Sequence, residues 1–98
     1  MLTGKQRATL RGVANGLAPV FQIGKGGVDE QVAEATATCL KKRELVKLRL
    51  LETSPLTARE AADALEEATG AETVQVIGRT VVLFLQKKKD SAYDKLLK

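Results

Sequence analysis

Five consecutive apolar residues, Val81 to Leu85, form the longest uninterrupted apolar run in this chain of 98 residues. The run is far shorter than the ~20 apolar residues that cross a membrane. Instead it is typical of a central strand, covered on both faces of its sheet. A turn signal at Gly78-Arg79-Thr80 comes just before it, after an extended stretch. Residues 72–87 therefore predict two strands joined by a short turn.

The rest of the chain alternates between helical and extended patterns. Thr3 and Thr57 each open a capping box, with Gln6 and Glu60 three residues later, which is a helix-start signal. Helices are expected at 3–15, 28–43 and 57–70, and further strands at 19–24 and 44–52. The predicted order is α-β-α-β-α-β-β, an α/β (α+β) single domain with a four-stranded mixed sheet. We place this domain at 1–86 and expect the basic segment 87–98 to be a mobile tail.

Charge is distributed unevenly along the chain, whose formal net charge is +4. Residues 1–27 contain basic side chains and no acidic one, whereas residues 44–86 contain more acids than bases. The predicted helix at 57–70 carries most of those acids on its outer side. This asymmetry indicates a polyanionic partner at one end of the molecule.

The composition argues against catalysis and against a bound metal. The chain has no histidine, the commonest general base and metal ligand, and one cysteine cannot build a zinc site. Cys39 lies on an apolar helical stripe with Val28, Val32 and Ala35, so we expect it to be buried and inert. We predict no enzyme activity, no cofactor and no small-molecule substrate. The first ten residues lack a signal-peptide core, and with no membrane span a cytoplasmic protein is expected.

The stretch Gly24-Lys25-Gly26-Gly27 lies between a predicted strand and a predicted helix. Glycines let a phosphate approach the backbone N–H groups at a helix amino terminus, and Lys25 adds positive charge. The dinucleotide fingerprint fails because Asp29 occupies its last glycine position, and the P-loop spacing is absent. A G-x-x-G clamp of the kind that KH domains use on nucleic acid remains. The alternative is an ordinary tight turn with an exposed lysine.

Other basic residues are candidate contacts to nucleic acid. Arg7 and Arg11 are four residues apart on one flank of the first helix, and Arg79 lies in a predicted turn. Lys47 and Arg49 mark the polar side of a strand, which is either plain solvent surface or a further contact. Aromatic residues make up 3% of the chain, too few for a base-stacking platform. Binding should therefore rely on phosphate contacts and shape.

The chain resembles CRM domains (chloroplast RNA splicing and ribosome maturation), in the bacterial stand-alone form known as the YhbY family. The resemblance rests on "LTGKQR" at 2–7, "QIGKGG" at 22–27, "ELVKLRLLE" at 44–52 and "VQVIGRTVVLF" at 74–84. It implies a fold similar to the carboxyl-terminal domain of translation initiation factor 3. It also implies RNA binding, with bacterial members associated with precursors of the large ribosomal subunit.

Carried onto this sequence, the family's loop is Gly24, Lys25, Gly26 and Gly27. Its neighbouring basic surface corresponds to Lys5, Arg7 and Arg11. We therefore expect a non-catalytic RNA-binding protein acting on ribosomal RNA or pre-50S particles. Two alternatives stay open: an Alba-like chromatin-type protein binding DNA or RNA, and a protein-interaction module whose basic end meets an acidic partner.

Overall fold

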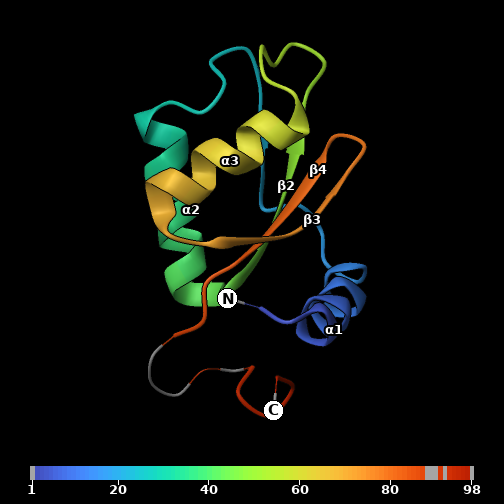
Figure 1. Cartoon of the computed structure of the whole chain (residues 1–98). Helices are drawn as coiled ribbons and strands as arrows, with labels where there is room; N and C mark the ends of the chain where they lie inside the picture. The colour runs from blue at the N-terminus through green and yellow to red at the C-terminus, as the bar shows by residue number, and fades with distance from the viewer. Residues whose placement is uncertain (1, 88–90, 92, 98) are drawn as a thin grey trace.

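The computed structural model of this chain describes residues 2–87, 91 and 93–97. Its elements are α1 (Gly4–Ala14), β1 (Phe21–Ile23), α2 (Glu30–Arg43), β2 (Leu45–Leu50), α3 (Ala58–Thr69), β3 (Glu72–Ile77) and β4 (Thr80–Phe84). The predicted order of elements is confirmed. The strands form one mixed sheet in the order β1-β2-β4-β3, in which only the β1–β2 pair is parallel. Figure 1 views this sheet from its β3 edge, with α2 and α3 on one side and α1 on the other.

Both predicted capping boxes are confirmed. The Thr3 hydroxyl accepts from the Gln6 backbone N–H, and the Gln6 side chain accepts from the Thr3 N–H at 2.9 Å. Thr57 and Glu60 make the same reciprocal pair at the start of α3. Each box satisfies two backbone donors that a helix start otherwise leaves unpaired. The start of each of these two helices is therefore fixed by hydrogen bonds between residues that are three positions apart.

Helix α2 differs from its prediction in start and in orientation. It begins at Glu30, with Asp29 as its N-cap, rather than at Val28. Its fully buried residues are Thr36 and Leu40, whereas Ala35 is exposed and Cys39 is only partly buried. The face of α2 that packs into the core therefore centres on Thr36 and Leu40, and the Thr36 hydroxyl donates to the Val32 carbonyl at 2.7 Å. A threonine bonded in this way is compatible with a core position.

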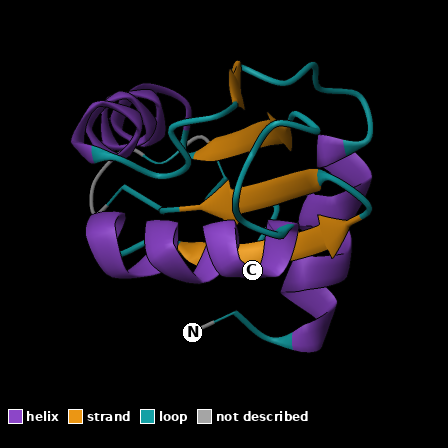
Figure 2. Ribbon diagram, turned by 90° about the horizontal axis from the view of Figure 1, so that it is seen from above, coloured by secondary structure: helices purple, strands orange, loops and turns teal. Residues whose placement is uncertain are grey.

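The apolar run at 81–85 supplies both faces of the sheet, as predicted for a central strand. Val81 and Leu83 point into a first core, shared with α2 and α3. Val82 and Phe84 point into a second core, shared with α1. Figure 2 shows the four strands side by side with helices on either side of the sheet. Strand β4 therefore contributes side chains to both cores.

The second core includes residues from both ends of the chain. Leu10 and Ala14 of α1 pack with Phe84 and with Leu97, which is 8% exposed. The Tyr93 ring meets the Phe84 ring edge-on, with 5.3 Å between centroids. We expected residues 87–98 to be mobile, and part of that segment lies outside the described residues. Two of its described residues, Tyr93 and Leu97, pack in the second core.

Glu44 joins α2 to β2 and is buried. Its backbone has φ of +66°, an uncommon value for a residue with a side chain. Its carboxylate accepts from the backbone N–H of Lys87 at 3.0 Å and from the Ser91 hydroxyl. The strand predicted at 44–52 therefore begins one residue later, at Leu45, and Glu44 holds the segment that follows β4.

Candidate nucleic-acid interface

Residues 24–27 form a tight turn directly after β1. The Gly27 N–H donates to the Gly24 carbonyl at 3.0 Å, which closes the turn. Lys25 and Gly26 form its exposed corner. Among the described residues, the backbone N–H groups of this corner have no hydrogen-bond partner. The corner therefore combines two available donors with a lysine charge, which is a favourable surface for an anion.

The three glycines of this turn meet different surroundings. Gly27 has φ of +62°, and a Cβ there would lie 3.4 Å from the Pro55 side chain. A Cβ at Gly24 would lie 3.4 Å from the Leu51 side chain. Both glycines therefore fit the turn against the loop that connects β2 to α3. Gly26 faces outward, and a Cβ there would meet only the Asp29 carboxylate, at 3.4 Å.

The amino terminus of α2 is not open as the sequence suggested. The Asp29 carboxylate accepts from the Val32 N–H at 2.9 Å and caps the helix. An acidic side chain thus occupies the place where a phosphate was expected to meet the helix. The amides that remain for an anion belong to the turn corner at Lys25 and Gly26.

The β3–β4 connection lies at the same end of the sheet as the 24–27 turn (Figure 1). Arg79 belongs to this connection, and its guanidinium is 3.6 Å from the carboxylate of Glu52. Both side chains are largely exposed, at 54% and 86%. Because such an exposed pair is weak and easily screened, Arg79 stays available to another anion.

The basic residues of α1 lie at the opposite end of the sheet from the turn. Helix α1 packs on Leu45, where β2 starts, whereas the turn contacts Leu51, just after β2 ends. At ~3.3 Å per residue, the six residue steps from Leu45 to Leu51 put roughly 20 Å between these two positions. Lys5, Arg7 and Arg11 therefore do not form one compact cluster with the turn, contrary to the surface that the family resemblance implied.

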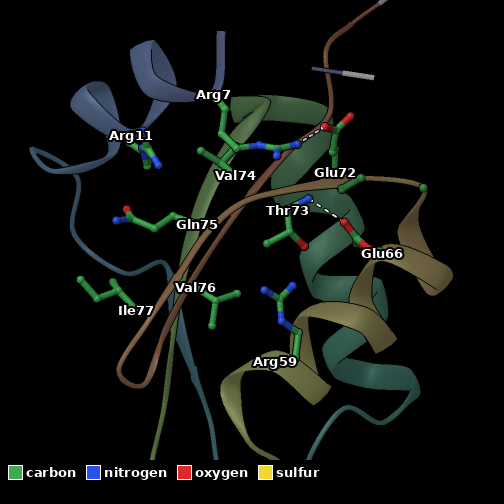
Figure 3. A pocket seen from close by; sticks show the side chains of 12 residues that line it. Arg7, Arg11, Arg59, Glu66, Glu72, Thr73, Val74, Gln75, Val76 and Ile77 are labelled. Carbon is green, nitrogen blue, oxygen red and sulfur yellow. Dashed lines mark hydrogen bonds and ion pairs between the residues drawn. The ribbon is translucent and has the colours of Figure 1, made fainter. Parts of the chain in front are cut away.

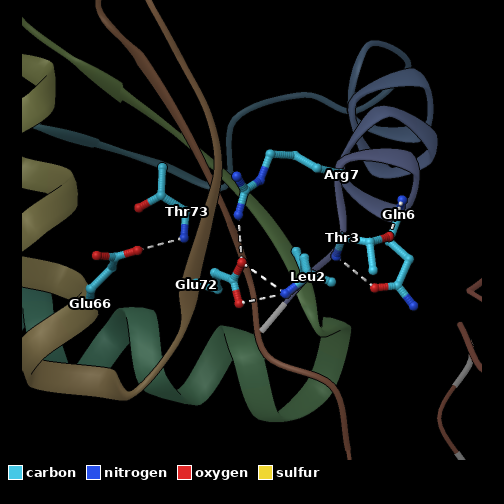
Figure 4. Close-up of polar contacts among 7 residues, drawn as sticks. All are labelled: Leu2, Thr3, Gln6, Arg7, Glu66, Glu72 and Thr73. Carbon is cyan, nitrogen blue, oxygen red and sulfur yellow. Dashed lines mark hydrogen bonds and ion pairs between the residues drawn. The ribbon is translucent and has the colours of Figure 1, made fainter.

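Arg7 is engaged in a contact within the protein (Figure 4). Its guanidinium donates to the Glu72 carboxylate at 2.5 Å, and the same carboxylate accepts from the Leu2 N–H at 3.0 Å. These contacts fasten the start of α1 to the start of β3. Lys5 and Arg11 are exposed, so they are the cations of this helix that are accessible to a partner.

A groove of about 760 Å³ runs along the outer edge of β3. Figure 3 shows Arg11, Gln75 and Ile77 on its α1 side, and Arg59 and Glu66 on its α3 side. The Glu66 carboxylate accepts from the Thr73 N–H at 2.7 Å, which satisfies one backbone donor of this edge. Arg59 was not predicted from the sequence to line this groove. The feature that singles it out in the sequence is that it is the one basic residue of α3.

Lys47 and Arg49 are neighbours on one strand face but have different surroundings. The Lys47 ammonium donates to the carbonyls of Leu17 at 3.2 Å and Ala14 at 3.4 Å, at the end of α1. Arg49 is exposed and, within the described part of the chain, makes no ion pair. Lys47 is thus a structural cation, whereas Arg49 is free to meet a partner.

The described residues contain no group of three or more histidine, cysteine or acidic side chains that could hold a metal ion. Among the same residues, no helix has the length and apolar character to span a bilayer. The pKa of Glu60 is lowered, first by its hydrogen bond to the Thr57 backbone and then by the Thr57 hydroxyl. This shift reflects the capping box of α3.

Together the fold and the turn define a small α/β domain with a glycine-lysine turn at one end of a mixed sheet. The chain belongs to the CRS1/YhbY (CRM) domain family, whose sequence profile matches residues 2–84. The family resemblance stated from the sequence is therefore confirmed.

Relatives of known name share this domain over most of their length. The chain is 40% identical over 90 residues to the Bacillus subtilis protein named "Probable RNA-binding protein YqeI", covering 92% of this chain and 94% of that one. It is 32% identical over 83 residues to a Haemophilus influenzae protein named "RNA-binding protein", covering 85% and 84%. The solution structure of SAV1595 from Staphylococcus aureus, described as a hypothetical protein and candidate RNA binder, matches with a TM-score of 0.78 and 42% identity. That match covers 93% of this chain and 95% of SAV1595.

Proposed function

We propose that this chain is a non-catalytic, cytoplasmic RNA-binding protein that contacts RNA phosphates through the corner of the 24–27 turn. Ribosomal RNA of large-subunit precursors is the target that the family resemblance implies. The names of the relatives support the general function, RNA binding. The observation that carries the site is the exposed Lys25–Gly26 corner, whose amides have no partner within the described residues.

Lys25→Ala tests the charge of this corner. Binding to a large-subunit ribosomal RNA fragment and to an unrelated duplex RNA is measured across a salt series. Loss of one phosphate contact should weaken binding to both RNAs and reduce the salt slope by roughly one. Circular dichroism of the variant checks that it is folded. Unchanged affinity and unchanged slope would contradict a role for Lys25.

Gly26→Asp tests the close approach of a phosphate, with Gly26→Asn as its matched control. Position 26 is exposed and its φ is not positive, so both side chains fit the fold. Asp adds bulk and negative charge where the phosphate approaches, whereas Asn adds the same bulk alone. We expect Asp to weaken RNA binding more than Lys25→Ala does, and Asn to weaken it less than Asp. If neither variant changes binding, the glycines serve only the turn.

The same titrations separate the two alternative functions. An Alba-like protein would bind duplex DNA in competition with RNA, whereas the proposed function predicts that RNA is preferred. A protein-interaction module would bind an acidic protein and be insensitive to Gly26→Asp. Failure of the wild-type protein to bind either RNA would overturn the proposal.

A further inference from the structure

One row of side chains crosses the whole sheet on the face that α1 partly covers. The registers pair Gln22 of β1 with Arg49 of β2, Arg49 with Thr80 of β4, and Thr80 with Ile77 of β3. Cross-strand partners point to the same side of a sheet, so these four side chains form one line about 14 Å long. We refer to Gln22, Arg49, Thr80 and Ile77 as the sheet row.

The sheet row lies beyond the part of the face that α1 covers. The second core packs α1 on Leu45, Val74, Val82 and Phe84, toward the other end of the strands. In the row, Gln22, Arg49 and Ile77 are exposed, and Ile77 reaches 61%. The row is therefore a strip of the sheet that α1 leaves uncovered. Nearer to α1, the register of β3 shifts between Thr73 and Gln75, so that Gln75 pairs with Val82 on the same side of the sheet.

The row is suited to a polyanion. It holds one cation, two hydrogen-bonding side chains and no acid. Arg49 makes no ion pair with any described residue, whereas its neighbour Lys47 is held by the end of α1. An exposed and unpaired arginine offers bidentate contacts to a phosphate.

The row also lies between the two groups of basic residues that the structure separates. Gln22 precedes Gly24 by two residues, so this end of the row is about 7 Å from the turn. At the other end, Ile77 lies on the same side of β3 as Gln75 and Arg11 (Figure 3). A strand crossing the row would therefore pass from the turn toward Arg11.

We infer that the sheet row is a second RNA-contacting surface, which continues the path of an RNA strand from the turn toward Arg11. Arg49 contacts a phosphate, and Gln22 and Thr80 contact phosphate oxygens or ribose 2′-hydroxyls. Ile77 packs on the apolar side of a ribose or base. This inference rests on the proposed function, because it requires RNA at the turn.

Arg49→Gln tests the charge of the row, with Arg43→Gln as its matched control. Arg43 is also an exposed arginine, but it lies at the end of α2, on the other side of the sheet from the row. A mixed-sequence single-stranded RNA is titrated across a salt series. We expect Arg49→Gln to weaken binding roughly fivefold at low salt and to lower the salt slope by about 0.7. Arg43→Gln should bind as the wild type does. Equal effects of the two variants would overturn the inference.

Gln22→Ala and Thr80→Val test the polar contacts of the row. The same RNA is compared with single-stranded DNA of identical sequence, because the 2′-hydroxyl distinguishes the two. Loss of RNA affinity with DNA affinity unchanged assigns these residues to the 2′-hydroxyl. An equal loss on both strands assigns them to phosphate. Wild-type affinity of both variants on both strands would remove them from the surface.

Lys25→Ala is measured in the same experiments. It distinguishes an error in the inference about the sheet row from an error in the proposed contact at the turn. If Lys25→Ala weakens binding and Arg49→Gln does not, the row is not a contact surface and the turn remains one. If Arg49→Gln weakens binding and Lys25→Ala does not, RNA binds the sheet face without the turn, and the path stated above is wrong. If neither does, both proposals fall.

Discussion

Adjacent glycines in the 24–27 turn differ in what they tolerate. Gly27 is buried, has φ of +62° and faces the Pro55 and Leu56 side chains. Gly26 is exposed, and only the Asp29 carboxylate lies within 4 Å of a Cβ placed there. Backbone conformation therefore favours glycine at position 27, whereas position 26 has room for a side chain.

Gly27→Ala should destabilise the protein by about 1–2 kcal/mol, the cost of a left-handed backbone at a residue with a Cβ. Gly26→Ala should change stability by less than about 0.5 kcal/mol, as most surface substitutions do. Urea unfolding midpoints of the two variants check this difference. Equal midpoints would show that the positive φ of Gly27 imposes no conformational requirement.

Helix α1 is fastened to the sheet by a polar contact at each end. Arg7 pairs with Glu72 near its start, and Lys47 donates to carbonyls at its finish. A lysine ammonium there interacts favourably with the negative end of the helix dipole. Between these contacts, Leu10 and Ala14 bury the helix on the second core.

Lys47→Met should destabilise the protein by about 1 kcal/mol, because it keeps an unbranched side chain but removes the donor to the α1 carbonyls. Arg49→Gln, two residues along the same strand face, should leave stability nearly unchanged because Arg49 is exposed. Thermal melting of the two variants gives the comparison. Identical melting temperatures would mean that Lys47 contributes nothing to the attachment of α1.

The molecule as a whole has two cores on opposite sides of one thin sheet, and the second depends on the described residues that follow β4. Tyr93 lies over Phe84. Burial raises the pKa of the Tyr93 phenol above its ordinary value of 10.0, and the Glu44 charge raises it further. The folded protein therefore binds this proton more tightly than the unfolded chain does.

Stability should consequently fall as the pH rises above about 10. Below that pH the phenol is protonated in both states, and its contribution is intact. Above it, the unfolded chain loses the proton first, and the contribution disappears as the pH passes the raised pKa of the folded state. Tyr93→Phe should remove this component, so the variant should lose less stability than the wild type over the same pH range. Melting temperatures between about pH 9 and 11 that stay parallel for the two proteins would contradict this.

Features set by neighbouring residues could be predicted from the sequence, whereas those set by distant contacts could not. The capping boxes at Thr3 and Thr57 need only a partner three residues away, and both were predicted. The different environments of Lys47 and Arg49 depend on where α1 ends, some 30 residues earlier in the chain. The engagement of Arg7 likewise depends on Glu72, 65 residues later. The sequence therefore identified the basic residues without showing which are already bound within the fold.

The second core combines residues of α1 with residues near the other end of the sequence, and this separation affects when the core can be completed during synthesis. The buried residues of the first core lie between positions 23 and 83, so they are all synthesised before the segment after β4. Helix α1 precedes its partners in the chain by a long stretch, because its apolar side packs on Val82, Phe84 and Leu97. Until Leu97 has emerged from the ribosome, α1 lacks part of its cover. Helix α1 is thus synthesised well before it can reach its final packing.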